Sequence, residues 1–105
     1  MNEYQRLLEQ IRDHLARFNV PRWPERINEW LRGVEMRNGE DRAHLTRTQQ
    51  SLGGMGSIAD IVICPEAGHI IPNDPQAIRA ANDTLLRLVG ELDAEVTKRL
   101  RDVHG

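Results

Sequence analysis

The sequence has a single cysteine, Cys64, and no apolar run longer than the four residues from Ile61 to Cys64. One cysteine cannot form an internal disulfide, which fits a reducing compartment. A membrane-spanning helix needs about 20 apolar residues, so a run this short excludes one. The N-terminal segment M-N-E-Y-Q-R-L-L-E-Q also lacks the basic start and unbroken apolar stretch of a signal peptide. We therefore expect a cytoplasmic protein that does not cross a membrane.

Lysine is nearly absent, because Lys98 is the only one and arginine supplies the other 13 of the 14 basic residues. With 16 acidic residues, the formal net charge is −2. The chain therefore lacks the strong basic field that nonspecific nucleic-acid binding requires, and we expect no nucleic-acid partner. Arginine suits protein interfaces and bidentate recognition better than lysine does. A high-GC genome also explains an arginine excess, so arginine alone indicates no site.

Apolar residues recur at three- and four-residue steps in three segments of the 105-residue chain, which predicts a single globular domain, residues 1–105, built mainly from helices. The first helix starts near Tyr4 and stops by Asn19, since Pro21 disfavours helical geometry in the residue before it. The second begins around Pro24 and ends near 38–39. The last has Asp74 as its N-cap and Pro75 in its first position, and its apolar stripe continues to Val103.

The middle of the chain predicts weaker elements. Residues 40–52 have helix-compatible composition but few apolar positions, so we expect a mostly exposed helix there. Residues 58–64 are rich in β-branched side chains and bounded by glycine and proline, and 69–71 can return as a partner strand after a turn at 65–68. Ser57 and Asp60 also have capping-box spacing, which favours a short helix through Ile63 instead. The resulting fold class is mainly α, with three to four helices and a short β-hairpin over about 58–71 packed against them.

The glycine-rich stretch Gly53-Gly54-Met55-Gly56-Ser57 is the first candidate site. A phosphate-binding P-loop needs a lysine after the last glycine, and none follows here. The dinucleotide fingerprint needs a third glycine, and a nucleophile elbow needs a glycine two residues after Ser57; both are missing. Two possibilities stay open: a shaped turn at positive φ, or an anion held by backbone amides alone.

No catalytic or metal-binding constellation emerges elsewhere. Cys64 and His69, with Glu66 between them, give too few ligands for a zinc site, and a buried, inert thiol is favoured. The remaining histidines lie on helical or terminal segments without ligand spacing: His14, His44 and His104. The sequence therefore predicts no enzyme, no metal and no cofactor.

Asp60 and Trp23 are the other two candidate binding residues. A carboxylate inside an apolar run is costly to bury unpaired, so Asp60 faces solvent, caps backbone amides of the glycine turn, or is presented to a partner; we favour capping. Trp23 stands between two prolines and is expected to be a surface anchor for a partner protein.

The stretch Gly53-Gly54-Met55-Gly56-Ser57, followed by an apolar residue, one variable position and Asp60, resembles a signature in a family of small uncharacterised bacterial proteins. Their alanine- and asparagine-rich last helix is similar to Ala80-Ala81-Asn82. The resemblance covers residues 52–92 and transfers no catalytic residue. Its size and type imply a protein of the immunity kind.

The leading functional hypothesis is accordingly a small non-catalytic binding protein that neutralises a cognate toxin by steric occlusion, with acidic side chains facing a basic surface of the toxin. Two alternatives remain. One is an anion or nucleotide site at the glycine-rich turn, and the other is a structural homodimer that pairs the last helix along Leu85, Leu92 and Leu100. The residues expected to bind the partner or ligand are Gly53, Gly54, Met55, Gly56, Ser57, Asp60 and Trp23.

Overall fold

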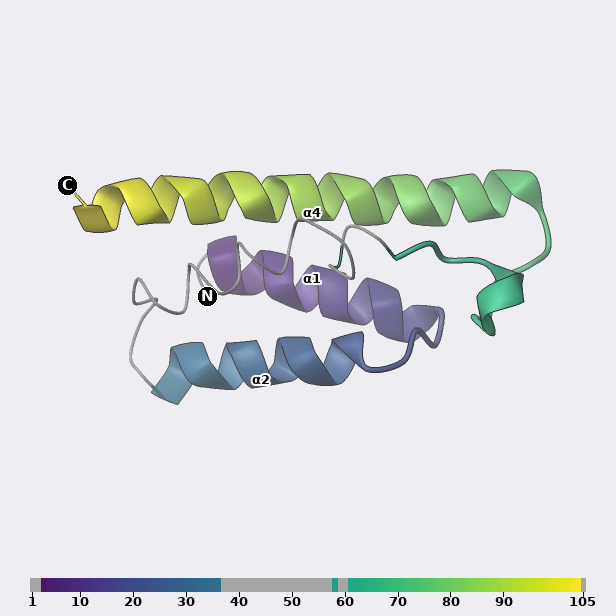
Figure 1. Ribbon diagram of the computed structural model, residues 1–105, viewed down its shortest axis with the longest axis horizontal. Helices are drawn as coiled ribbons and strands as arrows, with labels where there is room; N and C mark the ends of the chain where they lie inside the picture. Colours follow the sequence, from purple (N-terminus) through teal and green to yellow (C-terminus); the bar gives the residue numbers. More distant parts are fainter. Residues whose placement is uncertain (1–2, 37–57, 59–60, 105) are drawn as a thin grey trace.

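A computed structural model of the chain describes residues 3–36, 58 and 61–104. Within them lie three α-helices and one short 3-10 helix: α1 (Glu3–Arg17), α2 (Trp23–Met36), η2 (Pro65–Ala67) and α4 (Pro75–His104). Helix α1 is the middle layer, because it packs against α4 on one side and α2 on the other (Figure 1). The mainly helical architecture expected from the apolar periodicity is confirmed.

Helix α1 forms because its apolar residues fall on one face, and that face is fully buried between its two neighbours. It ends as expected before Pro21. Asn19 adopts a left-handed conformation with φ 57°, and the Val20 amide donates to the Leu15 carbonyl at 3.0 Å. The chain then turns, and α2 begins at Trp23, one residue before the expected proline.

Helix α4 starts as the sequence predicts. The Asp74 carboxylate accepts a hydrogen bond from the Ala77 amide at 3.3 Å, and the Asp74 carbonyl accepts one from the Ile78 amide at 3.0 Å. Pro75 occupies the first helical position, where its missing N–H is not needed. The helix then runs for 30 residues along the whole molecule (Figure 1).

The expected β-hairpin over 58–71 is wrong, since no strand occurs among the described residues of that segment. Ile58 has 3-10 geometry, and residues 61–64 have no regular secondary structure. The backbone groups that a hairpin would pair are bound to helices instead. The Ile63 amide and carbonyl bond to the Asn82 side chain, and the Ile70 amide donates to the Phe18 carbonyl at 2.8 Å. The turn expected at 65–68 is present as η2, with Gly68 at φ 84°.

All three α-helices and the segment before α4 contribute to one hydrophobic core. Its fully buried large side chains are Tyr4, Leu7, Leu8, Ile11, Leu15, Ile27, Ile58, Ile63, Leu85, Leu92 and Val96. The helix expected at 40–52 lies outside the described residues. No helix of the described ranges has both the length and the apolarity needed to cross a bilayer.

Candidate functional site

The glycine-rich stretch falls outside the part of the chain that the structure describes, as do Met55, Ser57 and Asp60. The site expected at Gly53, Gly54 and Gly56 therefore stays a prediction.

Trp23 is the one predicted binding residue whose surroundings can be described. It is half-buried at the start of α2 and packs against the core. The Arg26 guanidinium lies 4.7 Å from the centre of its ring, and the Trp30 ring meets it edge-on at 6.4 Å. These intramolecular contacts already cover part of the indole, so only a portion of Trp23 is free to anchor a partner.

Cys64 and His69 do meet, but through the backbone of Cys64. The Cys64 amide donates to Nδ1 of His69 at 3.1 Å, so the imidazole closes the turn around η2 as a hydrogen-bond acceptor. The thiol of Cys64 is half-buried and unoxidised. Across the described ranges, no three His, Cys, Asp or Glu side chains cluster in a way that could hold a metal ion.

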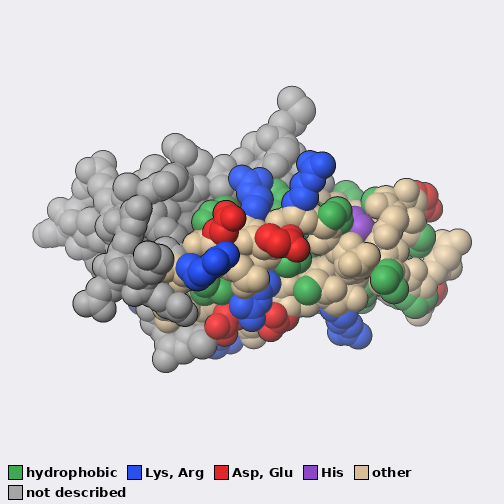
Figure 2. All heavy atoms as spheres, turned by 90° about the horizontal axis from the view of Figure 1, so that it is seen from below, with side chains coloured by type: hydrophobic (Ala, Val, Ile, Leu, Met, Phe, Trp, Pro, Cys, Tyr) green, Lys and Arg blue, Asp and Glu red, His purple; other side chains and the backbone are tan. Residues whose placement is uncertain are grey.

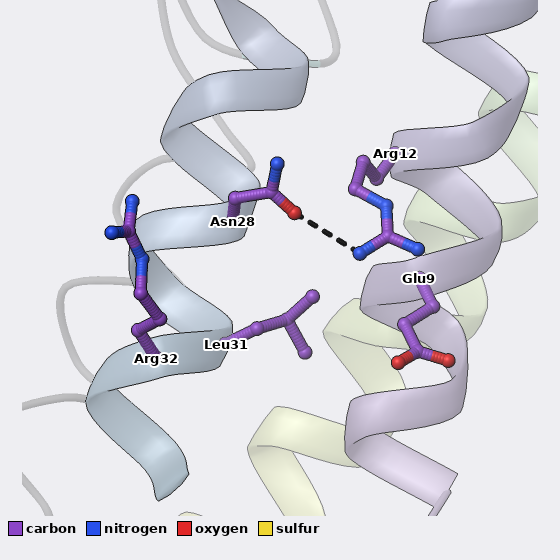
Figure 3. A pocket seen from close by; sticks show the side chains of 5 residues that line it. All are labelled: Glu9, Arg12, Asn28, Leu31 and Arg32. Atoms are coloured by element: carbon purple, nitrogen blue, oxygen red, sulfur yellow. Dashed lines mark hydrogen bonds between the residues drawn. The ribbon is translucent and has the colours of Figure 1, made fainter. Parts of the chain in front are cut away.

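A polar cleft of about 300 Å³ lies between α1 and α2 (Figure 3). Arg12 on α1 donates through Nη1 to Oδ1 of Asn28 on α2 at 3.0 Å, and through Nε to Asp13 at 3.0 Å. Arg32 points away from Arg12 on the far side of α2 (Figure 3). The two cations therefore do not converge on a common ligand. Arg12 is already engaged, and its bond to Asn28 ties α1 to α2.

A second hollow, which we call the α1–α4 cavity, lies between the end of α1 and the start of α4 and has a volume of about 330 Å³. His14 lies in its wall with Nε2 2.8 Å from the Ala81 carbonyl, which can only accept, so Nε2 carries the proton. The Phe18 ring meets the His14 ring edge-on at 5.1 Å. The lining residues are His14, Arg17, Phe18, Ile71, Pro72, Ala77, Ala80, Ala81 and Thr84.

The segment from 61 to 72, which we call the anchored segment, is held by side chains of the helices rather than by strand pairing. Asn82 of α4 accepts from the Ile63 amide at 2.7 Å and donates to the Ile63 carbonyl at 2.9 Å. Two large aliphatic side chains on this segment nevertheless face solvent: Val62 is 61 % exposed and Ile70 is 68 % exposed.

Charge is evenly mixed over the described part of the face shown in Figure 2, where acidic and basic side chains alternate. Among the described carboxyl groups, Glu3 has a clearly shifted pKa, and Glu3 lines neither hollow. A hydrogen bond from Arg6 lowers the pKa of Glu3, at the start of α1.

Comparison with known protein families, curated proteins and solved structures gives no match to this chain. The resemblance of the stretch from Gly53 to Asp60 to a bacterial family therefore stays a prediction.

Sequence reasoning did not single out the residues that shape these surfaces. His14 and Phe18 read as ordinary positions of an amphipathic helix, and Arg17 as part of its solvated face. Asn82 enters the sequence pattern only as part of Ala80-Ala81-Asn82, with no role of its own. An asparagine near the buried stripe of a helix was the one available signal, because such a side chain needs hydrogen-bond partners.

Proposed function

We propose that this chain is a small binding protein without catalytic activity that engages a protein partner, as an immunity protein engages its toxin. The observation that carries the proposal is the exposure of Val62 and Ile70 on the anchored segment. Isolated exposed aliphatic residues are common, but two on one short, tethered segment offer an apolar contact surface that a partner can cover. A cytoplasmic location is part of this proposal and stays a prediction.

The tethering favours binding because it reduces the entropy lost on association. Asn82 holds the arm before η2, the Phe18 carbonyl holds the arm after it, and the Cys64–His69 hydrogen bond joins the two arms. A surface that is already ordered loses little conformational freedom when a partner binds. Val62 and Ile70 stand two residues and one residue from the ends of the Cys64–His69 bond, and one partner surface is proposed to contact both.

The partner is expected to present an apolar patch with a basic rim. Exposed carboxylates lie on the anchored segment and beside it: Glu66 is in η2, Asp74 immediately precedes α4, and Asp83 is on α4. Such charges chiefly accelerate association with a basic surface and add less to affinity. Arg79 and Arg87 on α4 are also exposed, which would narrow the range of accepted partners.

The test uses the protein encoded by the adjacent gene, purified and immobilised for biolayer interferometry. Val62→Asp and Ile70→Asp are expected to weaken binding by about 30-fold or more each, since a desolvated anchor contributes roughly 2 kcal/mol or more. Ala94→Asp, at an exposed position further along α4, is the control and is expected to bind like the parent. No complex at micromolar concentration would rule out this partner class. Unchanged binding by both folded variants would rule out this surface.

A homodimer along Leu85, Leu92 and Leu100 loses its main support. Leu85 and Leu92 are fully buried in the core of the single chain, where α4 meets α1. That stripe is therefore not available to a second copy.

A further inference from the structure

We propose that the α1–α4 cavity binds a small amphipathic carboxylate, with its apolar body inside the cavity and its carboxylate at Arg17. This site is independent of the protein-partner surface at Val62 and Ile70. The inference rests on the size of the cavity, on the apolar character of its wall, and on Arg17 at its edge, which forms no ion pair with any residue that the structure describes.

The cavity has the size of a small-molecule site. Its volume of about 330 Å³ is at the lower end of ligand pockets, which begin at about 300 Å³. A hollow of this size, partly open to solvent, suits a compact organic acid. The room exists because α4 presents small side chains at helical spacing there, namely Ala77, Ala80, Ala81 and Thr84.

The wall is mostly apolar, and none of its nine residues is acidic. The Phe18 ring, Ile71 and Pro72 face the alanines of α4 and provide the surface for an apolar ligand body. His14 and Thr84 supply the few polar groups that orient a ligand in such a pocket. An apolar wall without a carboxylate favours an anionic ligand over a cationic one.

Arg17 is positioned to meet the anion. Its guanidinium lies 5.4 Å from the centre of the Phe18 ring, and among the described residues it forms no ion pair. Arg87 and Arg99 on α4, by contrast, are paired with Glu91 and Glu95. A carboxylate held beside Phe18 would give Arg17 the bidentate partner that its planar geometry matches.

The cavity is preformed by two hydrogen bonds across it. His14 bonds the end of α1 to the Ala81 carbonyl of α4 at 2.8 Å. The Ile70 amide bonds the anchored segment to the Phe18 carbonyl at 2.8 Å, which places the neighbouring Ile71 in the wall. A ligand therefore enters a cavity whose sides are already fixed, which lowers the entropic cost of binding.

The charge of the ligand is tested with three probes of similar shape: benzoate, benzamide and benzylammonium. Amide shifts of ¹⁵N-labelled protein are followed by NMR up to about 10 mM, where even millimolar affinity is visible. We expect benzoate to shift the amides of Ala77 and Ala81, and the other two probes to shift them at least about fivefold less at equal concentration. No shift with benzoate, or equal binding of benzoate and benzamide, would overturn the proposal.

Two variant pairs locate the site. Arg17→Gln is expected to weaken benzoate binding about fivefold to tenfold, because a charge-assisted hydrogen bond is lost, while Arg79→Gln leaves it unchanged. Ala80→Leu is expected to fill the cavity and abolish the shifts, whereas Ala94→Leu adds the same side chain elsewhere on α4 and preserves them. Leucine is a good helix former, so circular dichroism should confirm that both variants fold. Unaltered benzoate binding by Arg17→Gln or Ala80→Leu would place any binding outside this cavity.

Discussion

At the residue scale, Asn82 decides how the anchored segment meets the helices. Its side-chain amide accepts from the Ile63 amide at 2.7 Å and donates to the carbonyls of Ile63 at 2.9 Å and Ile78 at 2.8 Å. One side chain thus satisfies both backbone groups of Ile63, as a neighbouring strand would have done. This explains why a segment with the composition of a strand stays single.

Replacing Asn82 should therefore be costly. Asn82→Ala leaves the partly buried amide and carbonyl of Ile63 without partners, and we expect the free energy of unfolding to fall by about 2 to 3 kcal/mol. Asn82→Asp keeps an acceptor but loses both donated bonds, so it should also destabilise. Urea denaturation measures the change. Asn28→Ala, which removes a surface bond to Arg12, is the control, and an equal loss in Asn82→Ala and Asn28→Ala would contradict this role.

At the scale of the element, Gly68 and Gly90 both have room for a side chain, but they differ in backbone conformation. A Cβ added at Gly68 or at Gly90 would meet no other atom within 4 Å, so neither position is limited by packing. Gly68 ends η2 at φ 84°, a region that side chains disfavour. Gly90 lies inside α4, where glycine is a poor helix former. Glycine at position 90 therefore lowers the stability of α4 without a structural need, whereas the turn at η2 requires glycine at position 68.

Alanine at these two positions should shift stability in opposite directions. Gly90→Ala is expected to raise the free energy of unfolding by about 0.5 to 1 kcal/mol, because it restricts the unfolded chain at no steric cost. Gly68→Ala is expected to lower it by about 1 kcal/mol, because alanine is strained at positive φ. Thermal unfolding followed by circular dichroism compares the two. A shift of the same sign in both variants would show that backbone conformation is not the controlling factor.

At the scale of the whole molecule, one core joins elements that are distant in sequence. Helix α1 lies between α2 and α4 and buries its apolar face against both (Figure 1). Ile58, Ile63 and Ile71 add the segment before α4 to the same cluster. No described helix has a core of its own, so we expect the chain to unfold as one unit.

Two optical probes can test this cooperativity. Trp23 and Trp30 are the only tryptophans and both lie on α2, so their fluorescence reports on that helix. Of the described helices, α4 is the longest at 30 residues, so far-UV circular dichroism reports more on α4 than on α2. If the core is shared, the urea midpoints from both probes should coincide. A lower midpoint by fluorescence would mean that α2 detaches first and would contradict a single cooperative domain.

The sequence predicted most of the helical framework. Apolar spacing located the three described α-helices. Pro21 located the end of α1 to within two residues, and Asp74 and Pro75 located the start of α4, because capping and proline geometry act over a few neighbouring residues. It did not predict the α1–α4 cavity, which forms where Phe18 and Ile71 face the small residues of α4. These groups are far apart in the chain, and their spacing in space depends on how α1 and α4 pack.

In the anchored segment, the local sequence favoured one structure and the tertiary contacts decided for another. Its β-branched composition predicted an extended, buried segment, and the structure does bury Ile63 and give Cys64 an extended backbone. Whether it would pair as a strand depended on which partner reached its backbone groups. Asn82 and the Phe18 carbonyl, placed there by the packing of α1 against α4, reach them instead. The tertiary structure alone decided this, because a hydrogen bond between residues distant in sequence forms only where the fold brings donor and acceptor together.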